Sequence, residues 1–244
     1  QQKYEMVSKE EYYSQQPFPH IVVDNFAPID LINRAYRELI EVWPDWAYAI
    51  DPNSEKEQNK KEFYPYRNNN EEANVYIKRV NDMKSVCPHV GQIFNDLTSD
   101  EFLEKLGEMT GITNLFADPY FAGGGIHRIY TGGHLNVHTD YMLHPVEPWY
   151  RRINLLLYLT PDWQEEWGGN FEMWNEDTTE KIQDVSPVQN RCVIFNTTSK
   201  SFHGHPRPLN TPPDVQRWSV ALYYFTKHAP EGEEEHNTAQ WRYV

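Results

Sequence analysis

The pattern of apolar and polar positions in the first half of the chain predicts one short strand followed by helices. An apolar run at residues 19–24 is typical of a strand, and residues 29–42 carry apolar side chains at helical spacing, with Pro44 ending the pattern. Two further helices are predicted at residues 90–97 and 101–109. We therefore expect a helical support layer ahead of the rest of the fold.

From residue 116 onward the pattern changes to short apolar or alternating segments separated by turn residues. The predicted strands lie at residues 125–130, 135–140, 153–160, 170–174, 192–196 and 218–226. Many short strands of this kind favour two packed sheets. The expected fold class is mostly β with α: a double-stranded β-helix (jelly roll) core supported by N-terminal helices.

Two segments fit neither pattern. Residues 51–72 are crowded with Asn, Glu and Lys, which predicts an exposed, mobile insertion, and a lid over a ligand and a plain surface loop are equally open interpretations. The acidic tail at residues 229–244 is expected to be solvated. We treat residues 1–244 as a single domain, with an N-terminal support at 1–115 and a jelly-roll core at 116–228.

Composition narrows the partners of this domain. With 22 Lys and Arg against 36 Asp and Glu, the formal charge of -14 repels nucleic acid and anionic lipid. No apolar run approaches the roughly 20 residues of a membrane helix, and the first residues are unlike a signal peptide. Cys87 and Cys192 are too few for a disulfide framework. We expect a soluble, cytoplasmic protein with no nucleic-acid or membrane partner.

Candidate chemistry begins at residues 132–140. Strand alternation puts the polar side chains of this segment on one face: His134, Asn136, His138 and Asp140. His138 and Asp140 can reach one ion, and a distant third ligand would complete the two-His-one-carboxylate face that suits iron(II). A His-x-Asp pair also recurs by chance, so a solvated edge strand is the alternative.

Two later segments add to this pattern. His203 and His205 follow the apolar strand at residues 192–195 and share a face, so either could be a third ligand or could satisfy a turn. Arg217 opens the next apolar strand, and its planar guanidinium suits a carboxylate. That carboxylate could belong to a ligand or to the protein itself.

In this order, the motifs resemble the 2-oxoglutarate-dependent iron(II) oxygenases, in particular the prolyl 4-hydroxylase branch. Residues 151–163 and the Gly-Gly segment at 168–172 are similar to the central strand and turn of that branch, and residues 217–226 to its final core strand. The resemblance covers residues 116–228, and before them only residues 20–26 look familiar.

The resemblance implies that iron is held by His138, Asp140 and His203, which are then the catalytic metal site. The Pro-rich stretch at residues 206–216 departs from the family pattern, so His205 remains a rival ligand. Relatives that halogenate have a small apolar residue in place of this carboxylate. The presence of Asp140 therefore favours hydroxylation.

The resemblance also implies a site for the co-substrate. Arg217 and Tyr158 would hold the distal carboxylate of 2-oxoglutarate, and Ser219 and Tyr130 are lesser candidates for the same carboxylate. The implied cofactors are Fe(II) and 2-oxoglutarate, with ascorbate as a candidate accessory reductant. The implied reaction hydroxylates an organic substrate, either a prolyl residue of a peptide or a small metabolite, and releases succinate and carbon dioxide.

Other readings remain open from the sequence. The domain could be a non-catalytic jelly-roll binding module for a sugar or a protein, or a cupin-like metalloenzyme without a co-substrate. Histidines near the motif are expected to pack or to form hydrogen bonds rather than to bind metal: His127, His134 and His144. The substrate and the oligomeric state are not encoded in any pattern that we recognise.

Overall fold

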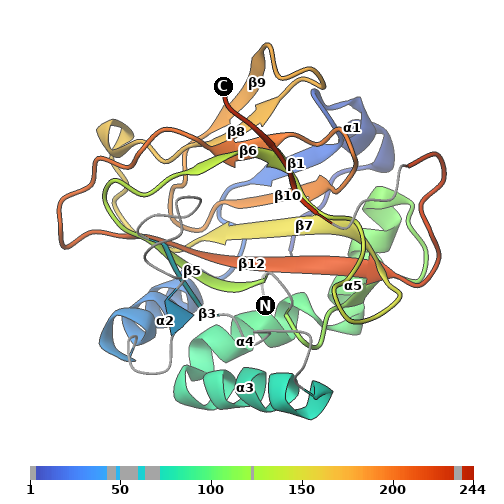
Figure 1. The fold of residues 1–244 in the computed structure, drawn as a ribbon. Coiled ribbons are helices and arrows are strands. Elements are labelled where there is room, and N and C mark those ends of the chain that lie inside the picture. Colours follow the sequence, from blue (N-terminus) through green and yellow to red (C-terminus); the bar gives the residue numbers. More distant parts are fainter. Residues whose placement is uncertain (1–3, 43–47, 50–59, 64–71, 122–123, 234–237) are drawn as a thin grey trace.

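Two antiparallel sheets form the centre of the molecule in the computed structural model, which describes residues 4–42, 48–49, 60–63, 72–121, 124–233 and 238–244 (Figure 1). Within these ranges one sheet has eight strands and the other has five. The arrangement agrees with the jelly-roll class expected from the spacing of the strands.

The larger sheet contains most of the long strands. Its order is β1 (His20–Val23), β10 (Cys192–Asn196), β7 (Tyr150–Tyr158), β12 (Arg217–Thr226), β5 (Gly125–Ile129), β3 (Lys60–Phe63) and β2 (Tyr48–Ala49), and β4 (Phe116–Ala117) also pairs with β12. Neighbouring strands are antiparallel, and Ser219 of β12 lies opposite Tyr158 of β7.

The smaller sheet holds the strands that carry the histidines of interest. Its order is β13 (Gln240–Arg242), β6 (Leu135–Thr139), β11 (His203–His205), β8 (Phe171–Trp174) and β9 (Lys181–Val185). Because β6 and β11 are neighbours, two segments more than 60 residues apart in the sequence lie side by side.

Helices pack on one face of the larger sheet. They are α1 (Lys9–Ser14), α2 (Ile29–Val42), α3 (Ala73–Val86), α4 (Pro88–Leu97) and α5 (Asp100–Thr110), with a 3-10 turn, η1, at Glu165–Trp167. The ends of α5 are well capped: Ser99 accepts a hydrogen bond from the backbone of Phe102, and Gly111 adopts a left-handed φ of 69°. No helix in the described ranges is both long enough and apolar enough to cross a membrane.

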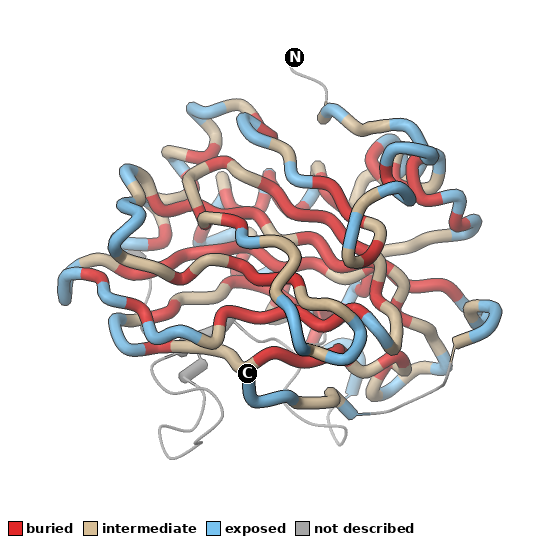
Figure 2. Tube along the Cα trace, turned by 90° about the horizontal axis from the view of Figure 1, so that it is seen from above, coloured by how far each residue is buried: buried red, intermediate tan, exposed pale blue. Residues whose placement is uncertain are grey.

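Strand alternation divides the core into two layers. On β7, Leu155 and Leu157 pack against the helices, whereas Tyr158 belongs to the cluster between the sheets. That second cluster joins Val193 and Phe195 of the larger sheet to Phe171 of the smaller one. Buried residues accordingly run along the strands of both sheets, and exposed residues gather in the connections (Figure 2). Side chains that point between the sheets are therefore held in a well-packed interior.

Several sequence expectations need correction. The segment expected as a solvated tail contains β13, because Gln240–Arg242 pairs with the backbone of β6, which would otherwise be an edge strand. The prediction of a mobile insertion or lid at residues 51–72 lies mostly outside the described residues. Its exception is Lys60–Phe63, which forms β3 and pairs with β5.

Candidate metal centre

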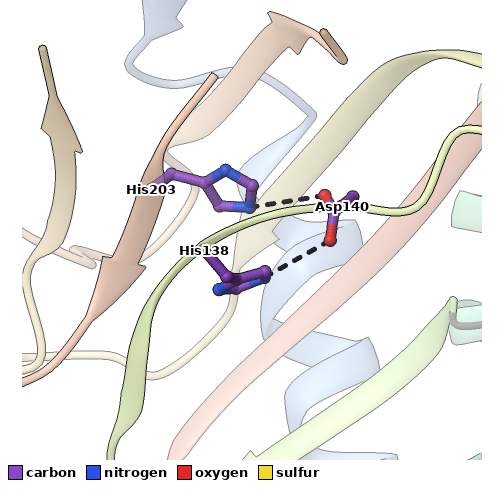
Figure 3. Close-up of side chains that lie close together, drawn as sticks. All are labelled: His138, Asp140 and His203. Atoms are coloured by element: carbon purple, nitrogen blue, oxygen red, sulfur yellow. Dashed lines mark ion pairs between the residues drawn. The ribbon is translucent and has the colours of Figure 1, made fainter. Parts of the chain in front are cut away.

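Three side chains from two neighbouring strands converge on one point (Figure 3). His203 of β11 lies directly opposite His138 of β6, and Asp140 follows the end of β6. One ligand atom from each residue can be chosen so that all three atoms lie within 4.8 Å of one another. In the part of the chain that the structure describes, this is the group of His, Cys, Asp and Glu residues that could hold a metal ion.

The two imidazoles present the same nitrogen to the carboxylate. The Nε2 atom of His138 is 3.3 Å from Oδ1 of Asp140, and Nε2 of His203 is 3.4 Å from Oδ2. Their Nδ1 atoms donate to the backbone oxygens of Asn136 and Ser201, at 2.8 Å and 2.7 Å. A backbone oxygen only accepts, so each Nδ1 carries the proton and each Nε2 keeps a lone pair for a metal. The donor set therefore fits a divalent cation.

Asp140 is supported on both oxygens. Asn154 of β7 donates its side-chain N–H to Oδ2 at 2.5 Å, and Nη1 of Arg151 is 3.5 Å from Oδ1. Burial raises the pKa of the Asp140 carboxyl, but His203, His138 and Arg151 outweigh burial and hold that pKa well below its usual range. The carboxylate is therefore ionised and positioned for a cation.

The chain behind Asp140 fixes the orientation of the amide. Thr197 donates its hydroxyl to the side-chain oxygen of Asn154 at 2.9 Å, so the amide N–H faces Asp140. Arg151 is held between two aromatic rings, 4.0 Å from the centroid of Tyr141 and 3.8 Å from that of Tyr223. Both supports of the carboxylate are buried and restrained.

The structure separates His203 from its rival. The pairing of β11 with β6 shifts register between His203 and His205, so that His205 lies opposite Leu135. Two residues of β11 thus span three of β6, which is the geometry of a bulge. Strand alternation alone predicts that the imidazoles of His203 and His205 point to the same face of the sheet. The bulge makes their positions relative to β6 different. His205 is buried but is not a member of the three-residue group.

A second set of predicted residues meets on the larger sheet. The guanidinium carbon of Arg217 lies 4.9 Å from the centroid of the Tyr158 ring, and its Nη2 donates to the Tyr158 hydroxyl at 3.5 Å. Ser219 lies opposite Tyr158 and, two residues from Arg217, on the same face of β12. These three residues therefore form one group.

Arg217 has the features of an anion site. It is only 4% exposed, and burial lowers the pKa of its guanidinium. Among the described residues no carboxylate forms an ion pair with it, and its buried Nε has no hydrogen-bond partner there. Gly169 makes room for it, since a Cβ at that position would lie 3.2 Å from Cδ of Arg217. A buried cation without a protein anion favours a ligand that carries one.

Tyr130 is placed differently from the other co-substrate candidates. Its ring lies 4.8 Å from the guanidinium carbon of Arg128, which also faces the ring of Trp218 at 4.9 Å. Trp218 and Arg217 are consecutive on β12 and so point to opposite faces. Tyr130 is thus grouped with the face that packs on the helices.

Of the three remaining histidine expectations, one can be compared with specific hydrogen bonds. His144 donates from Nε2 to Oδ2 of Asp118 at 2.9 Å, because its Nδ1 accepts from the backbone N–H groups of Val146 and Glu147. The expectation that this residue forms hydrogen bonds is confirmed. His127 and His134 are likewise outside the metal group.

Sequence reasoning did not find the residues that support Asp140. Asn154 lies within the predicted strand at residues 153–160, where a single polar residue among Leu and Ile was a usable signal. Thr197 and Arg151 gave no such signal, because their role depends on which strands become neighbours. Trp241 was missed for the same reason: its ring stacks on that of His138, with centroids 4.6 Å apart.

A sequence model of one protein family matches the segment that contains the metal centre. Residues 124–225, which contain all three metal-site residues together with Tyr158 and Arg217, match the sequence model of the 2OG-Fe(II) oxygenase superfamily. This part of the chain therefore resembles a 2OG-Fe(II) oxygenase domain. The His138, Asp140 and His203 group, which the structure brings together, fits the metal that such a domain uses. No curated protein matches the sequence significantly.

Solved structures share the fold of this chain. A prolyl hydroxylase from Trichoplax adhaerens, in complex with a hypoxia inducible factor peptide fragment, aligns with a TM-score of 0.59 and 13% identity, covering 88% of this chain and 86% of that chain. A prolyl 4-hydroxylase from Phytophthora capsici aligns at 0.55 and 18%, covering 89% and 62%. HygX from Streptomyces hygroscopicus, with nickel and 2-oxoglutarate bound, aligns at 0.55 and 13%, covering 90% and 87%. At these identities the likeness concerns the fold.

Proposed function

We propose that this chain is an oxygenase that hydroxylates a prolyl residue of a peptide or a small metabolite, with Fe(II) held by His138, Asp140 and His203. The observation that supports it best is the convergence of these three side chains, whose metal-binding atoms lie within 4.8 Å of one another on an interior face. Three protein ligands on one face of an octahedral ion leave three positions for co-substrate and oxygen. Because Asp140 takes the third protein position, none is left for a halide.

Arg217 and Tyr158 are proposed to hold the distal carboxylate of 2-oxoglutarate, with Ser219 beside them. Tyr130, which is grouped with the opposite face, is left out of this set. Support comes from the burial of Arg217 without a protein carboxylate among the described residues. When bound, iron and 2-oxoglutarate supply the oxidation chemistry, coupling loss of carbon dioxide and formation of succinate to hydroxylation. The residues of the chain fix where the co-substrate lies and exclude water from it.

Two structural neighbours bear on the substrate class. One structural neighbour is a prolyl hydroxylase in complex with a peptide fragment, and HygX has also been solved with hygromycin B bound. A peptide and a small molecule are therefore both open for this chain, and ascorbate remains a candidate reductant. The buried Arg217 and Tyr158 pair argues against a simple binding module, which has no need for a buried carboxylate site.

The deciding experiment measures succinate formation with Fe(II), 2-oxoglutarate and oxygen, against panels of proline-containing peptides and small metabolites. We expect slow 2-oxoglutarate turnover alone and faster turnover with the correct substrate. Failure of the protein to bind metal and 2-oxoglutarate, with no succinate under any condition, would contradict the proposal.

The choice of third ligand is tested by a matched pair of variants. His203→Ala is expected to abolish metal binding and 2-oxoglutarate decarboxylation, because it removes one of three ligands. His205→Ala is expected to retain the metal and to lose at most part of the activity. If His205→Ala loses the metal and His203→Ala keeps it, the two assignments must be exchanged.

A further inference from the structure

Strand β13 brings an aromatic residue to the metal centre from outside the segment that matches the family. The match ends at residue 225, and β13 comprises Gln240–Arg242. This strand pairs with β6, with Trp241 directly opposite His138. We propose that Trp241 forms the wall of the substrate site beside His138, where it positions that ligand and contacts an apolar part of the substrate.

The register of the smaller sheet supports this placement. Trp241 lies opposite His138, His138 opposite His203, and His203 opposite Met173. Residues directly opposite one another on antiparallel strands point to the same face, so the four side chains form one row across the sheet. Two members of that row are the proposed histidine ligands. Trp241 therefore faces the interior between the sheets, on the side of His138 away from β11.

The contacts of His138 show what the indole does there. Its imidazole is stacked on Trp241, with 4.6 Å between centroids and an interplanar angle of 28°, while its Nδ1 is bonded to the backbone of Asn136. The hydrogen bond fixes one edge of the ring, and the stacking fixes its plane. Trp241 is thus a positioning residue for His138 as well as a wall.

Trp241 is only partly buried, whereas His138 and His203 are each 6% exposed. Part of its ring therefore remains for another contact beside the metal. An indole face suits apolar C–H groups, such as those of an aliphatic ring, and the neighbouring Arg242 points the other way, over the ring of Phe202 at 5.0 Å. The substrate contact rests on the proposed function, but the effect on His138 does not require turnover.

The first test measures Co(II) affinity and the visible Co(II) spectrum of the unmodified chain and of Trp241→Ala, Trp241→Phe and Arg242→Ala. We expect Trp241→Ala to weaken Co(II) binding by about tenfold and to change the spectrum, in the range seen for residues that support metal ligands. Trp241→Phe should restore most of the affinity. Arg242→Ala, on the same strand but the opposite face, should bind Co(II) normally.

Equal losses in Trp241→Ala and Arg242→Ala would overturn the inference, because the effect would then belong to the strand and not to the indole. Normal Co(II) binding by Trp241→Ala would also overturn the positioning role while leaving the proposed metal site intact. If the unmodified chain bound no Co(II), both the proposed function and the inference would fail.

The second test concerns the proposed contact between Trp241 and the substrate. With a substrate found by the panels, Trp241→Ala is expected to raise the substrate KM at least fivefold when assayed at saturating metal, with the KM for 2-oxoglutarate unchanged. The substrate KM of Trp241→Phe should lie between those of the unmodified chain and Trp241→Ala. An unchanged substrate KM in Trp241→Ala would overturn the wall role.

Discussion

Asp140 brings the negative charge of the metal centre, and its neighbours decide how that charge is presented. Asn154 donates to Oδ2, and Thr197 fixes the amide of Asn154 by donating to its oxygen. Oδ2 is engaged in this short hydrogen bond, whereas the nearest groups to Oδ1 are the more distant Nε2 of His138 at 3.3 Å and Nη1 of Arg151 at 3.5 Å. Such an arrangement favours binding through one oxygen and keeps adjacent coordination positions open.

Replacing Asn154 tests this support directly. Asn154→Leu keeps the size of the side chain but removes the donor, so we expect metal affinity to fall roughly 10- to 100-fold. Thr197→Val should cost less, because the amide keeps its donor. Isothermal titration with Mn(II) measures both. Asn196→Leu is a matched control, since that side chain accepts from Tyr12 and not from the metal site. Equal affinities in Asn154→Leu and the unmodified chain would remove Asn154 from the site.

The second prediction at this scale concerns the role of Arg217 in the affinity for 2-oxoglutarate. Because its buried guanidinium is proposed to pair with a carboxylate, Arg217→Ala should weaken 2-oxoglutarate binding by roughly 2–5 kcal/mol while metal still binds. Tyr158→Phe should cost less, since the ring remains and only the hydroxyl is lost. Titration of 2-oxoglutarate into the Mn(II)-loaded variants gives the comparison. Unchanged affinity in Arg217→Ala would mean that another residue holds the carboxylate.

At the level of elements, local pattern was a good guide wherever one face of an element is buried. The helix predicted at residues 29–42 has those bounds in α2, and the strand predicted at 192–196 has those of β10. The sequence also indicated the three side chains that the structure brings together: strand spacing paired His138 with Asp140, and the family resemblance, rather than the pattern, favoured His203 over His205. For the elements, pattern suffices because alternation and burial are set by neighbouring residues.

Features that depend on long-range pairing could not be predicted in the same way. The bulge between β6 and β11, which distinguishes His203 from His205, exists only once the two strands are paired. Strand β13 spans only Gln240–Arg242 and follows an acidic segment, so its own sequence gives little β signal. The sequence showed Asn154 as a polar residue in an apolar strand, but it did not show that Asn154 donates a hydrogen bond to Asp140.

The pairing of β6 and β11 depends on a glycine between the two histidines of β11. A Cβ at Gly204 would lie 2.8 Å from the backbone oxygen of Asn136 and 2.9 Å from that of Leu135. Backbone atoms cannot move away cheaply, so Gly204→Ala should force β6 and β11 apart. We expect a loss of about 1–3 kcal/mol in the free energy of unfolding, together with weaker metal binding.

Denaturant unfolding and Mn(II) titration measure the two effects in the same preparation. Gly107→Ala in α5 is a suitable control, because the nearest atom to a Cβ there is 3.3 Å away and the residue is remote from the metal strands in the sequence. It should leave metal affinity unchanged. A Gly204→Ala variant with normal stability and normal affinity would show that the strands can separate without cost.

At the scale of the whole molecule, the accessibility of the two cysteines measures how tightly the core beneath the helices is closed. Cys87 and Cys192 are fully buried members of the same apolar cluster. Burial raises the pKa of the Cys87 thiol to about 12 and that of Cys192 well above its usual range, so neither forms the reactive thiolate near neutral pH. We expect almost no labelling by a thiol reagent at pH 8 in the native state and labelling of both in denaturant. Rapid native labelling would indicate local opening of this core.

Metal and co-substrate should stabilise the molecule in two distinct steps. His138 and His203 belong to the smaller sheet, through β6 and β11, and Asp140 directly follows β6, whereas Arg217 and Tyr158 belong to the larger sheet. Mn(II) alone therefore joins strands of one sheet, and 2-oxoglutarate bound to both the metal and Arg217 would link the two sheets.

Thermal unfolding can separate these steps, because a ligand present at 100 times its Kd adds about 2.7 kcal/mol of stability, or about 5–10 °C in Tm for a chain of this size. We expect Mn(II) to raise Tm, 2-oxoglutarate to raise it further only when Mn(II) is present, and Arg217→Ala to lose the second rise while keeping the first. His203→Ala should lose both. A rise with 2-oxoglutarate that is equally large without metal, or that persists in Arg217→Ala, would show that the co-substrate binds somewhere other than between the two sheets at this centre.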